Sequence, residues 1–280
     1  MARGAFRPTR PVEVFAIEDR SAQVVVRAPR PRVVEVAGLE PGTPQTVEVD
    51  GHRVDVTTLT APPGRELARI ATLSDLHLGI PHHFGVRDDP GSAEPFALRC
   101  ARAAAREAVA WGAELIVLKG DLTHTGRDHE WEQLALLLDE IPVPVAVIIG
   151  NHETKHLRRR ADERRDPRKA LADLGTPHAP VASVDVQGAR VVLADTTVPG
   201  RGYGRIPRHR HDEIVTTVAA SPSPVLLMLP HPLEPYPVPV AYPFGVGWAG
   251  ATRLVRALRE ANPAVFVTSG HSHRHRARFH

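Results

Sequence analysis

The chain has 280 residues, of which 42% are hydrophobic and 24% are charged, proportions typical of globular proteins and not of disordered, collagen-like or membrane-embedded chains. The formal net charge is only +3, so charge alone does not indicate a nucleic-acid partner, which would need basic residues clustered on one face. No apolar stretch of signal-peptide length follows the N-terminus, and nowhere do about 18 apolar residues run together, so we expect a cytoplasmic protein without a membrane partner.

Short alternating apolar runs occupy the N-terminal region, residues 1–66. β-Branched residues recur at every second position, and Pro, Gly and Asp separate the runs, which predicts strands of a small antiparallel sandwich. The predicted strands are 12–17, 23–26, 33–36, 46–49 and 54–59. The stretch that begins Leu39-Glu-Pro-Gly-Thr, continues through two strands and ends in Ala61-Pro-Pro-Gly resembles the end of a fibronectin type III module. We expect a small all-β, fibronectin III-like domain.

The segment 61–65 contains two prolines and a glycine, which cannot continue a strand ladder, and it is interpreted as a linker to a second domain, 67–280. In that domain apolar runs alternate with helical patterns, which predicts an α/β fold with strands covered on both faces. The predicted strands are 70–73, 114–118, 143–149, 191–194, 225–229 and 264–268. The predicted helices are 95–111, 128–140, 166–174, 210–220 and 250–261.

Single residues in these helices carry further expectations. Cys100 is the one cysteine, so no intramolecular disulfide can form, and it falls where a small buried residue fits; a reducing compartment is expected. Trp131 lies at helical spacing with leucines and is interpreted as a core residue. Gly112 and Gly175 follow predicted helices, as glycines at helix C-caps do.

Polar clusters follow all but one of the apolar strands: Ser74–His77, Gly120–Asp121, Gly150–Glu153, Pro230–Pro232 and Gly270–His273. Ligands of open α/β sheets bind beyond the carboxyl ends of the strands, so the clusters are expected to meet in one crevice. Their donors are hard oxygens and imidazoles without a thiolate, which suits ions such as manganese, iron or zinc in a catalytic site. Seven donors exceed what one catalytic ion takes, and this number favours two ions that share ligands.

The order Asp-x-His, Gly-Asp, Gly-Asn-His-Glu, a lone His and Gly-His-x-His, between residues 68 and 273, resembles the calcineurin-like metallophosphoesterase superfamily. The resemblance implies a four-layer αββα sandwich with two metal ions between its sheets. It implies a first metal held by Asp75, His77 and His273, and a second held by Asn151, His231 and His271, with Asp121 bridging both. It also implies that His152 is a catalytic residue that contacts substrate and not a metal.

The resemblance predicts an enzyme in which a hydroxide activated by two divalent ions, manganese or iron with zinc as an alternative, attacks a phosphoester. The stretch from Asp195 to Gly204 is similar to class III cyclic-nucleotide phosphodiesterases, which favours a phosphodiester in a small nucleotide-derived substrate. The alternatives are a phosphomonoesterase, a protein phosphatase or a nuclease of the same superfamily, and an inactive scaffold.

Several features near these motifs keep two interpretations. His124 is interpreted as a loop residue in preference to a pocket residue, and His82 and His83 either contact substrate or lie in an ordinary loop. The stretch 236–248 forms either a substrate wall or a packed loop.

Glycines 120, 150 and 270 are expected at sharp turns that need unusual φ and ψ. The chain stops seven residues after His273, from which we expect a truncated chain and a loosely held His273.

Overall fold

The computed structural model of this chain forms two compact units, residues 1–65 and 66–280. The residues that it describes are 11–27, 32–61, 63–80, 82–83, 86–87, 94–154, 165–176, 178–233 and 245–272.

The first unit is all-β. A three-stranded antiparallel sheet has the order β1-β2-β3, and two further strands, β4 and β5, pair with each other. The bounds are β1 Val12–Ile17, β2 Ser21–Val26, β3 Arg32–Ala37, β4 Pro44–Val49 and β5 His52–Thr57. The β4–β5 turn is Asp50-Gly51, both with positive φ (52° and 74°), as a type I′ hairpin requires. Alternate side chains of β2, β4 and β5 form the apolar core of this unit.

The second unit contains two larger sheets. One is parallel, with the order β10-β9-β6, and the other has the order β11-β12-β13-β14, in which only the β11–β12 pair is antiparallel. Their bounds are β6 Ile70–Leu73, β9 Leu115–Lys119, β10 Val145–Ile148, β11 Val181–Val186, β12 Ala189–Ala194, β13 Val225–Leu229 and β14 Val265–Ser269. The two-residue strands β7 (His82–His83) and β8 (Val86–Arg87) pair separately.

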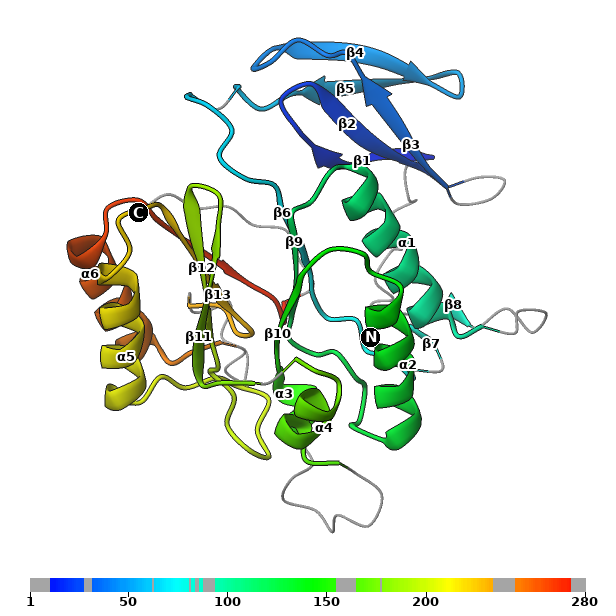
Figure 1. Cartoon of the computed structure of the whole chain (residues 1–280). Helices are drawn as coiled ribbons and strands as arrows, with labels where there is room; N and C mark the ends of the chain where they lie inside the picture. The colour runs from blue at the N-terminus through cyan, green and yellow to red at the C-terminus, as the bar shows by residue number, and fades with distance from the viewer. Residues whose placement is uncertain are drawn as a thin grey trace, which may run out of the picture. The chain divides into compact units, whose positions relative to one another are not determined.

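Helices cover the outer face of each sheet, as Figure 1 shows for the second unit. Those that share a core with the parallel sheet are α1 Phe96–Ala110, α2 Asp128–Asp139 and α4 Pro167–Asp173. Those that share a core with the mixed sheet are α5 Arg208–Ala219 and α6 Trp248–Ala261. Side chains of β9, β10, β12 and β13 form a further apolar core between the two sheets. The layers are therefore helix, sheet, sheet and helix, and the α/β fold expected from the sequence is confirmed.

Two expectations about burial were wrong, while Trp131 does lie in the core. Cys100 is exposed, because α1 buries the stripe formed by its alanines and Leu98, which Cys100 does not join. Strand β14 is not covered on both faces: Phe266 is 63% exposed and Val267 is 42% exposed, since β14 is the last strand of its sheet among the described residues. Within this described part, no helix has the length and apolarity needed to cross a bilayer.

Candidate metal centre

The carboxyl ends of five strands from both sheets meet at one place. Asp75 follows β6 and His271 follows β14, and the backbone N–H of His271 donates to both carboxylate oxygens of Asp75, at 2.9 and 3.0 Å, across 196 residues of sequence. The ring of His271 lies 5.0 Å from that of His231, centroid to centroid, and its Nδ1 lies 3.8 Å from Oδ2 of Asp121. Donors far apart in the sequence therefore face one another, as expected from the positions of the strand ends.

Three donors of the parallel sheet form one compact group. One ligand atom from each of Asp75, His77 and Asp121 lies within 4.8 Å of the others. The hydroxyl of Ser74 donates to Asp75 at 2.5 Å, and the backbone N–H of His77 donates to the carbonyl of Asp121 at 2.9 Å. The first bond orients Asp75 within its own strand end, and the second, with that from the backbone N–H of Asp75 to the carbonyl of Gly120 at 3.0 Å, joins the ends of β6 and β9.

Asp121 lies at the centre of the arrangement and is 3% exposed. Its Oδ1 accepts a hydrogen bond from the backbone N–H of His152 at 2.9 Å. Burial opposes ionisation of this carboxyl, but the facing imidazoles of His271 and His152 and that backbone bond outweigh burial and hold its pKa well below the usual range. Asp121 is therefore a carboxylate at neutral pH, the state in which a carboxyl group can bind a metal ion.

Two buried polar atoms in this place have no hydrogen-bond partner among the described residues: Oδ1 of Asn151 and Nε2 of His231. Leaving such an atom unsatisfied costs roughly 1–3 kcal/mol. The other ring nitrogen of His231, Nδ1, lies 2.8 Å from the hydroxyl of Thr196. Burial and the neighbouring His271 lower the pKa of His231 to about 4. A neutral ring with its proton on Nδ1 would turn the Nε2 lone pair into the site, and the residues therefore fit a bound metal ion.

The backbone at the proposed ligands is unusual. Five described non-glycine residues have positive φ, and four of them are Asp75 (57°), His77 (46°), Asp121 (48°) and His271 (69°). L-residues seldom adopt this left-handed region, and such conformations persist where the surrounding structure determines them, often at functional sites.

Glycine is needed beside the proposed ligands for two different reasons. Gly120 has a φ of +80°, as expected. Gly150 and Gly270 are not among the positive-φ residues, so the expectation of unusual φ was wrong for them. A Cβ at Gly150 would lie 2.2 Å from both the backbone nitrogen and Oδ1 of Asp121, and one at Gly270 would lie 2.9 Å from Oδ2 of Asp75. Close approach between loops requires glycine at both positions.

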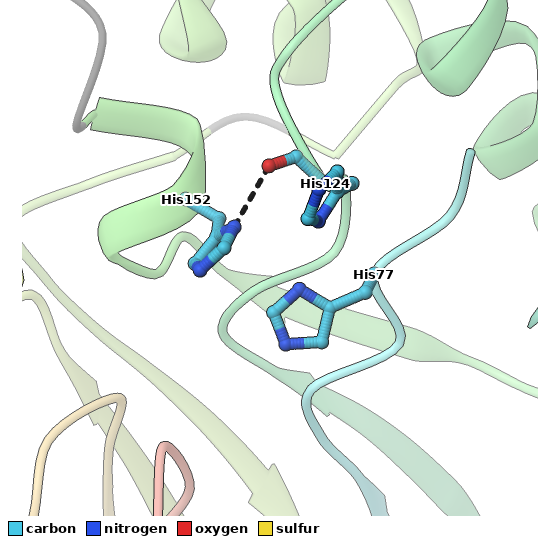
Figure 2. A group of neighbouring side chains, drawn as sticks. All are labelled: His77, His124 and His152. Atoms are coloured by element: carbon cyan, nitrogen blue, oxygen red, sulfur yellow. Dashed lines mark hydrogen bonds between the residues drawn. The ribbon is translucent and has the colours of Figure 1, made fainter. Parts of the chain in front are cut away.

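A second group consists of three imidazoles. The ring of His77 lies 4.4 Å from that of His152 and 5.9 Å from that of His124, centroid to centroid. Figure 2 shows the hydrogen bond between Nδ1 of His152 and the carbonyl oxygen of His124, at 2.7 Å. A carbonyl only accepts, so the proton of His152 is on Nδ1, and Nε2 is the nitrogen available to a ligand.

Two side chains that support the site were not assigned a role from the sequence. Glu153 is fully buried and accepts hydrogen bonds from the backbone N–H and the hydroxyl of Thr123 and from the backbone N–H of Gly150. Burial and the neighbouring Asp121 raise the pKa of Glu153 to about 8. Thr196, beside His231, is the other. Glu153 stands in the Gly-Asn-His-Glu motif, and Thr196 stands after strand β12 in the 195–204 stretch that resembles class III phosphodiesterases, but neither signal indicated a contact with a ligand.

Some residues singled out in the sequence lie outside the described residues, and these include His273, the proposed third ligand of the first metal, and 236–244 of the suggested substrate wall. His82 and His83 form β7.

The fold and the donor set define a metal-binding hydrolase of phosphoric esters. Residues 68–275 match the model of the calcineurin-like phosphoesterase family, and the chain belongs to this family. The resemblance inferred from the motifs is thereby confirmed.

Similar proteins include three bacterial relatives. The chain is 26% identical over 211 residues to a probable cyclic nucleotide phosphodiesterase of Synechococcus, which covers 73% of this chain and 72% of the relative. It is 30% identical to a probable cyclic nucleotide phosphodiesterase of Rhodococcus erythropolis, over 59% of this chain and 54% of the relative. It is 27% identical to a cAMP/cGMP dual specificity phosphodiesterase of Mycobacterium tuberculosis, over 57% of this chain and 48% of the relative. The alignments thus span about half the length of the last two.

Among solved structures, a dimetal phosphatase from Danio rerio is similar, with a TM-score of 0.49 and 14% identity over 75% of this chain and 82% of that chain.

Proposed function

We propose that this chain hydrolyses a phosphodiester bond in a small, nucleotide-derived substrate, with two divalent metal ions as cofactors. The observation that carries the proposal is the meeting of donors from both sheets, in which His271 bonds to Asp75 and faces Asp121. The cyclic-nucleotide names of the three relatives favour a diester of this kind. We also assign residues 1–66 and 67–280 to separate domains and place the reaction in the second.

The proposed ligands divide into two sets that share Asp121. Asp75, His77 and His273 would hold the first ion, and Asn151, His231 and His271 the second. Manganese or iron suits this mixture of oxygen and imidazole donors, with zinc as the alternative. When bound, such ions supply a hydroxide nucleophile at neutral pH and neutralise charge on the phosphoryl oxygens.

The protein's own residues would position the ester and handle the proton. His152 holds its Nδ1 proton against the carbonyl of His124, which leaves Nε2 for the substrate. When the ring also carries a proton on Nε2, that nitrogen can donate to a phosphoryl oxygen or pass its proton to the leaving oxygen. Asp121 accepts from the backbone N–H of His152 and so fixes that ring relative to the metal ligands. The attack would be a direct in-line displacement without a covalent enzyme intermediate.

Hydrolysis of bis(p-nitrophenyl) phosphate and p-nitrophenyl phosphate, each with Mn²⁺ and with excess chelator, tests the proposal. We expect turnover that depends on Mn²⁺, with the diester at least about tenfold faster, because each 1.4 kcal/mol of transition-state preference changes the rate tenfold. Preference for the monoester would replace the proposal with a phosphomonoesterase. Absence of metal-dependent turnover of either ester would leave the inactive scaffold.

The nuclease alternative needs its own measurement, since nucleic acids are also phosphodiesters. Cleavage of DNA or RNA faster than of cyclic AMP, with binding that weakens steeply as salt rises, would favour a nuclease. We expect cyclic nucleotides to be the better substrates.

A further inference from the structure

We infer that His124 is a further substrate-contacting residue, whose imidazole acts beside that of His152 to bind the phosphoester next to the proposed metal ligand His77. The inference rests on the proposed function. Figure 2 shows that the three side chains come from separate segments of the chain and surround one small region. They follow β6, β9 and β10 respectively.

The first observation is that the three rings are close enough to contact one ligand. One ring nitrogen from each of His77, His124 and His152 lies within 4.8 Å of the others. A phosphoryl group has several oxygens and could accept hydrogen bonds from two imidazoles at once at this spacing. The rings of His124 and His152 are 5.4 Å apart and only 34° from parallel, whereas the ring of His77 is edge-on to both. His124 and His152 thus form a pair, and His77 lies on their metal-site side.

The second observation is that hydrogen bonds fix the loop that contains His124. The backbone N–H of His124 donates to the carbonyl of Leu78 at 2.9 Å, and its own carbonyl accepts from His152. On one side, Thr123 is held by the carboxyl group of Glu153. On the other, the backbone N–H groups of Thr125 and Gly126 donate to the carboxylate of Glu130. Side chains that position substrate are effective when the surrounding bonds fix them in this way.

The same bonds bear on the simpler interpretation, in which His124 only completes the loop. The hydrogen bonds that shape residues 121–126 include one from the backbone of His124 and several to the carboxyl groups of Glu130 and Glu153. The loop has these supports whatever side chain stands at position 124. The imidazole is partly exposed, beside the candidate metal centre, where a ligand can reach it.

A set of variants tests the role of the imidazole. His124→Ala removes the ring, while His124→Asn and His124→Gln keep an amide N–H near the place of Nδ1 or Nε2. His129→Ala removes an exposed histidine five residues away on α2 and is the matched control. Each protein is saturated with Mn²⁺, and its metal content and melting temperature are measured first, so that effects on folding and metal binding are separated from effects on substrate.

Two measurements then follow: kcat/KM for phosphodiesters with good and poor leaving groups, and the dissociation constant of inorganic phosphate. We expect His124→Ala to lose about 100- to 1,000-fold in kcat/KM, the range for removing one donor from a charged transition state. We expect it to bind phosphate several-fold more weakly, with unchanged metal content. One amide variant should recover part of both losses, and His129→Ala should match the wild type.

Each contrary outcome has a distinct meaning. Wild-type values for His124→Ala in both measurements would overturn the inference and leave the proposed function standing. Loss of a bound metal ion in His124→Ala would also overturn it, because the residue would then be a ligand. A wild type that neither turns over an ester nor binds phosphate would overturn the proposed function, and this inference with it. If His124→Ala does not fold, the two amide variants decide by the same measurements.

Discussion

The two sheets contribute to the candidate metal centre in different ways. The parallel sheet supplies carboxylates, an amide and imidazoles from three strand ends, and buried bonds such as those of Glu153 to Thr123 and Gly150 connect these ends. The mixed sheet supplies two imidazoles with fewer supports: His231 contacts Thr196, and the backbone of His271 bonds to Asp75. The first half is thus preorganised by its own bonds, while His271 depends on the first half for its position.

Replacing Asp121 should break both halves and have the largest effect. Asp121→Asn removes the only carboxylate proposed to serve both ions, although the amide oxygen can still accept from the backbone of His152. We expect kcat for a phosphodiester to fall at least about 1,000-fold, since metal ions contribute several kcal/mol of transition-state stabilisation. Bound metal should fall as well, as measured by elemental analysis after gel filtration. Full metal content with full activity would contradict the bridging role.

Replacing Thr196 should affect the mixed-sheet half alone. Thr196→Val keeps the shape of this fully buried side chain but removes its contact with Nδ1 of His231. We expect metal affinity to fall about 10- to 100-fold, the usual effect of losing a bond that orients a ligating histidine. Competition with a fluorescent chelator measures it.

Two controls accompany that experiment. Thr196→Ser keeps the hydroxyl and should stay near the wild-type affinity. Thr217→Val removes an exposed threonine hydroxyl that bonds only within α5 and should leave affinity unchanged. Equal affinities for the valine and serine variants at position 196 would show that the hydroxyl does not position His231.

Asp195 offers the smallest effect, on stability and not on metal binding. It follows β12 and is 8% exposed, and its carboxylate contacts His178 and the backbone and hydroxyl of Thr197. Burial opposes ionisation, but the bonds from His178 and Thr197 prevail and lower the pKa of Asp195. A lowered folded-state pKa stabilises the fold above the unfolded-state value, about 4, and that contribution is lost as pH falls through the lowered pKa.

Asp195→Asn should therefore lower stability by about 1.5–3 kcal/mol at pH 7, the range for hydrogen bonds to a charged group. The difference in melting temperature from the wild type should shrink as pH falls below about 4. Asp185→Asn removes an exposed ion pair with Arg190 and should change the melting temperature little. A difference for Asp195→Asn that grows on acidification would contradict the assignment.

The strands and ligand motifs were predictable because strong local signals mark them. Runs of apolar residues ended at the positions where the structure places the polar clusters, and the order of the motifs indicated the family. Strand β11 was not predicted, because its half-buried alternation at a sheet edge gives no long apolar run. The contact of Thr196 with His231 and the close approach of Gly150 to Asp121 depend on which loops meet in space. Local sequence patterns do not predict such contacts between distant loops.

Four proposed metal ligands have a left-handed backbone: Asp75, His77, Asp121 and His271. The conformation that positions them for catalysis also lowers the stability of the fold. Strain of about 1–3 kcal/mol at each such residue would together approach the net stability of an ordinary domain, about 5–15 kcal/mol. Glycine at these positions would relax the backbone and also remove the proposed ligands. A search for thermostable variants without metal would therefore favour changes at these four positions, whereas selection for turnover would retain the strained residues.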